Sequence, residues 1–423
     1  MLMLHERSYS SDEIKILFLG YAIPEDMLTE VTAKDPYPQI QGSRLIWMIL
    51  KGLERSKGSP IDLISAVPAS EYPKNSKIFF GYNRWKHDLS GGDDYIMPYI
   101  NIIIIKHVTR LFSSFVLVSR WLIRNRKHLE KIILIYALHS PFLISALLAT
   151  FFWGGKIILF IPDMPAFMDL GINRNIVIRI AKKIDVFIIN KILQGAAGVI
   201  AITEHMANDI AHDNIPSMVM EGAVPTERAS EKEVKTVRSS SMAKGGKIIT
   251  YAGGMFEEYG VKLLLDAFAL VSGKEYRLWL FGKGEMEGAV KAYTVRDPRI
   301  IYWGMLPNQE LLDLEAQSTV LINPRLSGAE FTKYSFPSKL LEYMITGRPV
   351  VSTMLPGIPR EYHEYLFILQ DETPLGLAKL LQEVCEKPQT ELSDIGQRAR
   401  SFVMREKNYL RQGERMFNFI QSC

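Results

Sequence analysis

Charged side chains gather in one stretch of the sequence, Asn323 to Tyr362, around the expected start of a helix. Pro337 suits the first helical position, which needs no backbone N–H, and Gly347 is a natural end signal. Free N–H groups and the positive dipole end at such a start favour an anion such as a diphosphate. The charged residues around this start are Arg325, Glu330, Lys333, Lys339 and Glu342.

Composition alone favours a plainer interpretation of this stretch, an αβ unit with solvated charges, but the residue order favours a site. YSFPSKLLEYMITGRPVVSTMLPGIPREY, which ends at Tyr362, resembles the donor-binding signature of retaining glycosyltransferases of family four, whose fold is GT-B. It is most similar to the branch that builds bacterial exopolysaccharide, capsule or O-antigen chains. The resemblance spans most of the chain and is strongest from Thr250 to Tyr362.

The resemblance implies roles for individual residues of this segment. In the family, two glutamates flank the loop, and the second matches Glu342, which would contact the nucleotide ribose. The first position holds Tyr334, a departure from the family pattern. Either Glu330 or the Tyr334 hydroxyl would then contact the sugar. Ser335 and Ser338 complete the expected donor-binding set of this loop.

Two glycine loops in the second half of the chain are further donor-site candidates. The expected strand KIITYAGG ends at Gly253 and Gly254, whose backbone N–H groups can approach a phosphate. A second expected strand ends at Gly282 and leads to Gly284, near the nucleotide. The family often has Arg and Lys in the first loop, where this chain has Gly254 and Tyr259. The phosphate charge would then be met by Arg325, Lys333 and Lys339.

In the first half, two polar residues follow expected buried strands. His139 follows the strand Ile132 to Leu138, and Asp163 follows the strand Lys156 to Ile161, between Pro162 and Pro165. Ligand groups lie at the carboxyl ends of strands in open parallel sheets. In related transferases a histidine or aspartate after the latter strand faces the donor sugar. Asp163 matches that position and is the first catalytic candidate, followed by His139 and Glu330.

Gly42 and Arg44 are candidates for the acceptor side. They end a long polar loop and precede an expected helix with Leu45, Ile49 and Leu53 at four-residue spacing. A glycine before a helix lets the backbone approach a ligand closely, although a plain turn glycine explains it equally well. The family often has a glycine-rich loop here, facing the cleft between its domains.

Composition excludes several classes of protein. The chain has 423 residues, enough for two domains, with 48% hydrophobic and 23% charged residues, as in globular proteins. A net charge of +4 argues against bulk nucleic-acid binding. The two cysteines, Cys385 and Cys423, suggest neither a disulfide framework nor a metal cluster, which fits a reducing cytosol. With no Asp-x-Asp motif, we expect no metal and no other cofactor.

Two segments bear on membranes. Ile132 to Trp153 is apolar enough to suggest a span, but His139, Ser140 and Pro141 interrupt it, so a strand, a loop and a buried helix are expected. His107 to His128 is basic and amphipathic and suits either an anionic membrane surface or an ordinary surface helix. Family members with lipid-linked acceptors dock to the inner membrane face in this way. The N-terminus lacks the apolar core of a signal peptide, so a cytoplasmic, partly peripheral protein is expected.

Alternating strands and helices predict an α/β protein with parallel sheets. We expect the GT-B architecture, two Rossmann-like domains facing across a cleft. Residues 1–225 would bind the acceptor and residues 226–400 the nucleotide sugar, while a helix over 401–423 packs back on the first domain. A charged linker is expected from Pro225 to Gly246.

The implied activity is retaining transfer of a sugar from a UDP or GDP sugar to a lipid-linked or polysaccharide acceptor. Two alternatives stay open at this point. One is a nucleotide-sugar epimerase on the same fold, which needs no acceptor. The other is a non-catalytic subunit that binds carbohydrate or membrane.

Overall fold

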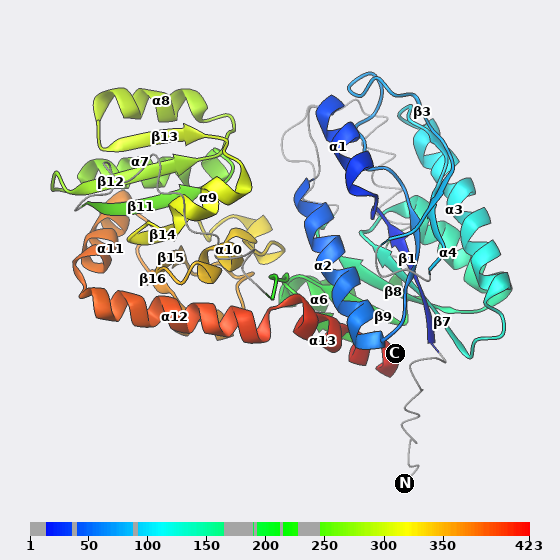
Figure 1. Ribbon diagram of the computed structural model, residues 1–423. Coiled ribbons are helices and arrows are strands. Elements are labelled where there is room, and N and C mark those ends of the chain that lie inside the picture. The colour runs from blue at the N-terminus through cyan, green and yellow to red at the C-terminus, as the bar shows by residue number, and fades with distance from the viewer. Residues whose placement is uncertain are drawn as a thin grey trace, which may run out of the picture. The chain divides into compact units, whose positions relative to one another are not determined.

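The computed structural model describes residues 14–35, 40–87, 92–164, 189, 193–211, 215–226 and 246–423. The chain divides into two compact units. The first unit comprises Met1–Ala223 and Tyr409–Cys423, and the second comprises Val224–Asn408. Each unit has a parallel or mostly parallel sheet with helices on both faces, so the predicted α/β class is confirmed (Figure 1).

The described sheet of the first unit has the order β10-β9-β8-β7-β1-β2-β5-β4, with β4 and β5 antiparallel and the other pairs parallel. Its central strands, β1, β2, β7, β8 and β9, are buried along nearly their whole length, as expected for strands covered on both faces. The chain order reverses between β1 and β7. The strands are β1 (Ile14–Gly20), β2 (Asp62–Ser65), β4 (Asn83–Trp85), β5 (Asp94–Ile96), β7 (Glu130–Tyr136), β8 (Lys156–Ile161), β9 (Gly198–Ala201) and β10 (Ser217–Val219).

Helices cover both faces of this sheet. The helices α2 (Ile40–Lys57) and α13 (Tyr409–Ser422) lie side by side on one face, and α3 (Ile105–Arg124) and α4 (Ser140–Trp153) lie on the other (Figure 1). The first pair packs closely: a Cβ on Gly413 would lie 2.1 Å from the Gly52 carbonyl carbon. The unit also contains α1 (Glu25–Lys34), α6 (Glu204–Ala211) and the short antiparallel pair β3 (Phe79–Phe80) and β6 (Tyr99–Ile100).

The described sheet of the second unit is fully parallel, in the order β13-β12-β11-β14-β15-β16. Its order reverses between β11 and β14. The helices α7 (Val261–Leu270) and α11 (Pro374–Glu386) share one core with the sheet, and α10 (Lys339–Ile345) and α12 (Gln389–Glu406) share another on the opposite face. The strands are β11 (Lys247–Ala252), β12 (Tyr276–Phe281), β13 (Ile300–Gly304), β14 (Val320–Asn323), β15 (Val350–Thr353) and β16 (Phe367–Leu369).

The helices of this unit follow the predicted αβ alternation. They are α7 (Val261–Leu270), α8 (Glu287–Arg296), α9 (Asn308–Glu315), α10 (Lys339–Ile345), α11 (Pro374–Glu386) and α12 (Gln389–Glu406). Three short 3-10 helices join them, η2 (Glu257–Tyr259), η3 (Glu330–Lys333) and η4 (Arg360–Tyr365).

Several expected boundaries are wrong. Gly42 lies in the first turn of α2 and does not precede it. Pro337 precedes α10, which begins at Lys339, so proline does not occupy the first helical position. The expected helix over 401–423 is two helices, because α12 ends at Glu406 and α13 begins at Tyr409. Most of the linker expected from Pro225 to Gly246, namely residues 227–245, lies outside the described part of the chain.

The apolar segment Ile132 to Trp153 folds as the predicted strand and helix, β7 and α4. Helix α4 has 14 residues, fewer than a membrane span requires. Among the described helices, none is both long and apolar enough to cross a membrane.

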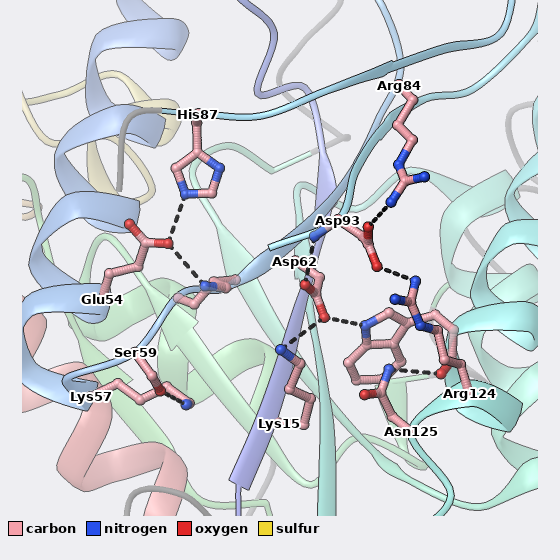
Figure 2. A network of polar contacts seen from close by, with 12 residues as sticks. Lys15, Glu54, Lys57, Ser59, Asp62, Arg84, His87, Asp93, Arg124 and Asn125 are labelled. Carbon is pink, nitrogen blue, oxygen red and sulfur yellow. Dashed lines mark hydrogen bonds and ion pairs between the residues drawn. The ribbon is translucent and has the colours of Figure 1, made fainter. Parts of the chain in front are cut away.

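A buried polar network lies at the amino ends of β2 and β5 in the first unit (Figure 2). His87 bridges two carboxylates, with 2.7 Å between Nε2 and Glu54 Oε1 and 2.7 Å between Nδ1 and Asp94 Oδ2. Burial lowers the pKa of His87, but hydrogen bonds with the two carboxylates outweigh burial and raise it to about 10. His87 is therefore an imidazolium at neutral pH that ties α2 to the strand β5.

A second part of this network centres on Asp62, the first residue of β2 (Figure 2). Its carboxylate accepts a hydrogen bond from Trp121 Nε1 at 2.7 Å and lies 3.2 Å from Lys15 Nζ. The neighbouring Asp93 pairs with Arg84 and Arg124. These charges join strands and helices at the edge opposite the carboxyl ends, so we interpret the network as structural.

Replacing His87 should destabilise the first unit, because Glu54 and Asp94 would stay buried without their cation. We expect His87→Asn to lower the free energy of unfolding by about 3 kcal/mol at pH 7. The stabilisation from a raised histidine pKa is complete below about 6.5 and is lost as the pH rises through about 10. Urea unfolding between pH 7 and pH 10.5 measures both effects.

The matched control is His128→Asn, because His128 is exposed on the surface of the same unit. Wild type and the control should lose stability together towards pH 10.5, while His87→Asn should lose less over that range. A His87→Asn variant as stable as the control at pH 7 would contradict the structural interpretation.

Candidate functional site

In each unit, polar residues meet where the strand order reverses, at the carboxyl edge of the sheet. Ligands bind in open α/β sheets at such a switch point, because the loops after the two flanking strands diverge there. In the second unit the switch lies between β11 and β14, and in the first between β1 and β7. The candidate residues of the two units are described separately.

The predicted glycine loops follow β11 and β12 and pack directly on one another. Gly282 has a φ of +124°, and a Cβ there would lie 1.9 Å from the Gly253 carbonyl oxygen. A Cβ on Gly284 would lie 2.5 Å from the carbonyl oxygen of Met255. These glycines therefore allow two backbones to approach each other, in addition to any approach to a ligand.

Gly253 does not offer the N–H group that the sequence predicted for a phosphate. Its N–H donates to the Phe281 carbonyl at 2.9 Å, which continues the ladder between β11 and β12. The Gly254 carbonyl accepts the Tyr251 hydroxyl at 2.8 Å, which fixes the loop. Of this pair, Gly254 stays the phosphate candidate.

Arg325 follows β14 and is held rigidly on the other side of the same switch point. Its guanidinium carbon lies 4.4 Å from the ring centre of Tyr259 and 5.5 Å from that of Phe331, and its Nη1 donates to Ser335 Oγ at 3.0 Å. Burial lowers the pKa of Arg325, which nevertheless stays cationic at neutral pH. Its buried Nε has no hydrogen-bond partner in the described residues.

Tyr259 and Gly260 explain how Arg325 reaches this position. A Cβ on Gly260, at a φ of +78°, would lie 1.9 Å from the Pro324 carbonyl oxygen, so the loops after β11 and β14 touch. The aromatic ring of Tyr259 then stacks on the guanidinium. A cation from the β14 loop is thus supported by an aromatic ring from the β11 loop, where the family pattern has a basic residue.

Lys339 and Glu342 form an ion pair on α10, with 2.5 Å between Nζ and Oε2. Both side chains are partly exposed, so a ligand can reach either one. Ser338 precedes α10, is exposed and makes no capping hydrogen bond. The seven-residue helix is short, so individual side chains at this edge matter more than the helix dipole.

The remaining donor candidates lie on and after η3. Glu330 and Lys333 are the first and last residues of η3, and both are exposed. Tyr334 follows directly and is half-buried. The structure therefore brings Arg325 and Ser335 into contact, and pairs Lys339 with Glu342, while Glu330 and Lys333 face solvent.

Sequence reasoning missed Glu315, the last residue of α9. Its side chain is 0% exposed, and neither carboxyl oxygen has a partner in the described chain. Burial is the main cause that raises the pKa of Glu315 to about 7. The charge of Lys339 lowers this pKa and the charge of Glu342 raises it, so Glu315 lies close to that ion pair. The sequence gives no signal for it, because Glu315 is one of several acidic residues on an amphipathic helix.

In the first unit, His139 lies directly before α4, at the end of the chain turn after β7. Ala137 has a φ of +71°, unusual for a residue with a Cβ, and it turns the chain into His139. The imidazole packs on Phe142 at 4.7 Å, between ring centres, and on Tyr21 at 6.1 Å. Burial, together with the nearby cation of Arg110, holds the pKa of His139 well below its usual range.

Asp163 lies two residues after the end of β8, at the carboxyl edge of the sheet. Its side chain reaches solvent on one side, yet surrounding protein desolvates the carboxyl and raises its pKa to about 6. Asp163 in turn helps to raise the pKa of Tyr136, so the two residues are neighbours. A Cβ on Gly42 would lie 4.0 Å from the Tyr136 hydroxyl, which brings Gly42 to the same edge. Arg44 is exposed on α2, and Pro165 lies outside the described residues.

The described part of the chain contains no group of three or more His, Cys, Asp or Glu side chains arranged to hold a metal ion.

One comparison with known proteins concerns the second unit. Residues 246–387 match the family model described as "Glycosyl transferases group 1". The matched residues lie within the second unit, Val224–Asn408. No curated protein gives a significant match to the sequence.

Solved structures match nearly the whole chain, at identities that show the fold alone. HepE from Anabaena, in complex with UDP, has a TM-score of 0.61 and 13% identity and covers 97% of this chain and 100% of its own. Sucrose-phosphate synthase from Thermosynechococcus elongatus has a TM-score of 0.64 and 12% identity, covering 96% and 98%. The lipopolysaccharide outer core galactosyltransferase WaaB has a TM-score of 0.61 and 17% identity, covering 96% and 99%. The chain therefore has the GT-B fold that these proteins share.

Proposed function

We propose that this protein is a glycosyltransferase that moves a hexosyl group from a nucleoside diphosphate sugar, with retention, to a lipid-linked or polysaccharide acceptor in surface polysaccharide synthesis. One observation carries the donor part of the proposal. Arg325 is fixed between two aromatic rings at the switch point of the second unit, with a buried Nε that lacks a partner in the described chain. HepE, a structural neighbour, has been crystallised with UDP-glucose.

The chemistry follows from this arrangement. As the bond between the sugar C1 and the phosphate loosens, negative charge grows on the leaving diphosphate. A preorganised guanidinium stabilises that charge, because its position needs no reorganisation during the reaction. Lys333 and Lys339 add point charges nearby. Removing one such donor costs about 3 kcal/mol of barrier.

The ribose contact is assigned to Glu342. A carboxylate can accept hydrogen bonds from both ribose hydroxyls, and Glu342 is partly exposed on α10. In the structure Glu342 pairs with Lys339. Binding of the ribose to Glu342 would therefore weaken or replace this ion pair. Lys339 would then be freed towards the diphosphate.

Replacing Glu342 should weaken nucleotide binding. A hydrogen bond to a charged acceptor contributes about 1–3 kcal/mol, so Glu342→Ala should raise the Kd for UDP or GDP by roughly 5- to 150-fold. Isothermal titration calorimetry measures the Kd, and Glu310→Ala, an exposed glutamate on α9, is the control. An unchanged Kd in folded Glu342→Ala would refute the ribose contact.

The proposal includes a diphosphate neutralised by Arg325 and lysines in place of a metal ion. Transfer should therefore continue after treatment with EDTA, because hard divalent cations need several oxygen ligands beside the phosphates. The measurement is the rate of sugar transfer before and after chelation. Loss of transfer with EDTA and recovery with Mn²⁺ would show that a metal takes part.

Asp163 is proposed to orient the donor sugar and to stabilise positive charge that develops at its C1. Both tasks require the carboxylate form, and both act mainly in the transition state. The alternative is a structural role, in which Asp163 bonds nearby backbone N–H groups. No hydrogen bond to Asp163 is formed by the described residues, and only burial shifts the pKa of its carboxyl.

Asp163→Asn should reduce transfer at least about tenfold while nucleotide affinity stays normal. Because the pKa of Asp163 is about 6, wild-type transfer should fall as the pH drops below 6, and the variant should lack this loss. The pH profile of kcat tests this. Transfer by Asp163→Asn at the wild-type rate would exclude the catalytic role.

Stability separates the two roles of Asp163. A carboxyl whose pKa is raised in the folded state stabilises the fold less as the pH rises from about 4 to 6. Asp163→Asn should therefore be as stable as wild type, or more stable, at pH 7. If Asp163 instead caps nearby backbone N–H groups, Asp163→Asn should be less stable than wild type at pH 7.

The outer sides of α3 and α4 are proposed to contact an anionic membrane surface. Apolar side chains there face solvent, among them Phe112, Phe151 and Trp153, and Phe151 is 81% exposed. Arg120, Arg126 and Lys127 are exposed on α3 or directly after it. Arg110 belongs to the basic segment His107 to His128 but does not share this surface, because its side chain is buried. Apolar side chains beside cations fit an anionic lipid surface.

The protein should sediment with vesicles that contain anionic phospholipids at low salt, and less so at about 1 M salt, where charges are screened within about 3 Å. Replacing Phe151 and Trp153 by Ser should weaken this binding. Val295→Ser is the control, since Val295 is an equally exposed apolar residue of the second unit. Equal binding to neutral vesicles, or no effect of the Ser substitutions, would refute this surface.

A further inference from the structure

A pocket of about 310 Å³ lies in the first unit at the switch point between β1 and β7. Tyr21 follows β1 directly, Ser70 and Glu71 lie on the chain after β2, and His139 follows β7. Lys106 and Arg110 reach the pocket from α3. The pocket is lined entirely by residues of the first unit, whereas the donor candidates on α10 and η3 belong to the second.

The lining is strongly basic. Its side chains include two buried cations, Lys106 and Arg110, together with Lys74, His107 and His139, against a single carboxylate, Glu71. Burial and the neighbouring Arg110 lower the pKa of Lys106 to about 8. Two cations held this close repel each other, which is costly unless an anion lies between them.

Arg110 is fixed in the wall of the pocket. It is 3% exposed, its Nη2 donates to the Val67 carbonyl at 2.9 Å, and its guanidinium carbon lies 4.2 Å from the ring centre of Tyr99. Its Nε is buried without a hydrogen-bond partner in the described chain. A buried guanidinium donor of this kind is normally satisfied by an acceptor, so an acceptor atom of a ligand would complete it.

Lys106 and His139 extend the same pattern. Lys106 is buried, and its Nζ donates to the Ala69 carbonyl at 2.9 Å, which leaves further N–H groups of the ammonium for a ligand. His139 Nε2 is buried and without a partner among the described residues. Neither Lys106 nor Arg110 forms an ion pair with a carboxylate within the described ranges.

We propose that this pocket binds a phosphoryl group of the acceptor substrate, held between Lys106 and Arg110 with His139 donating a further hydrogen bond. Several donors converge on a small pocket with two fixed positive charges, which suits the oxygens and the charge of a phosphate or diphosphate. The inference rests on the proposed function, because it specifies the class of acceptor. The acceptor is then a sugar or lipid linked through phosphate.

Inorganic pyrophosphate is the first probe, titrated calorimetrically in the presence of saturating UDP, which occupies the donor site. We expect binding, weakened at least tenfold in Lys106→Gln and in His139→Gln. Lys51→Gln, an exposed lysine on α2, and His128→Gln are the matched controls. Binding should also weaken as the pH rises above about 8, where Lys106 loses its proton while Arg110, Glu71 and Asp35 keep their charges.

Geranyl diphosphate, titrated under the same conditions, distinguishes the source of the phosphoryl group. Tighter binding than pyrophosphate indicates a lipid-linked acceptor, and equal binding indicates recognition of the diphosphate alone. Failure of pyrophosphate to bind, wild-type affinity in folded Lys106→Gln, or binding of glucuronate in its place would overturn the proposal. Failure of UDP to bind would instead refute the donor site, and the pyrophosphate titration would still test the pocket.

Discussion

The reversal of strand order in each parallel sheet is the constraint on which both sites depend. In a parallel sheet every strand delivers its loop to the same edge, and loops diverge where neighbouring strands continue in opposite directions. The β1/β7 reversal places Tyr21 and His139 at one point, and the β11/β14 reversal does the same for Gly254 and Arg325. Residues more than 70 positions apart in the sequence thus meet without any local signal.

At the β11/β14 reversal, the loop after β11 has glycine and aromatic residues where the family often has basic residues. Gly260 lets the loop after β11 touch Pro324, and Tyr259 then stacks on Arg325. An aromatic face costs little desolvation and still attracts a guanidinium. The departure from the family at Gly254 and Tyr259 is thereby compatible with a positively charged phosphate site, because the cation comes from the neighbouring loop.

The sequence predicted those features that depend on local patterns. Buried strands were recognised because runs such as Lys156 to Ile161 are almost entirely apolar, and that strand has the predicted bounds. Gly42 was misplaced because a glycine signals a turn locally, whereas packing of α2 on the sheet extends the helix through it. Arg110 and Glu315 could not be predicted as buried. Their burial depends on distant partners, such as Val67 for Arg110, and a lone charge in a helix gives no sign of its tertiary surroundings.

The two edges of the first sheet differ in whether their buried charges form ion pairs. At the amino edge, the cation of His87 lies between Glu54 and Asp94, and Asp62 receives Lys15 and Trp121, so each buried charge has an opposite charge or donor beside it. At the carboxyl edge, Lys106 and Arg110 are buried against carbonyl oxygens and an aromatic ring, and Glu71 and Asp35 act on Lys106 without an ion pair to it in the described chain. An uncompensated buried charge costs several kcal/mol, so a fold keeps it only where a ligand offsets that cost. The contrast within one sheet therefore separates charges that stabilise the fold from charges that await an anion.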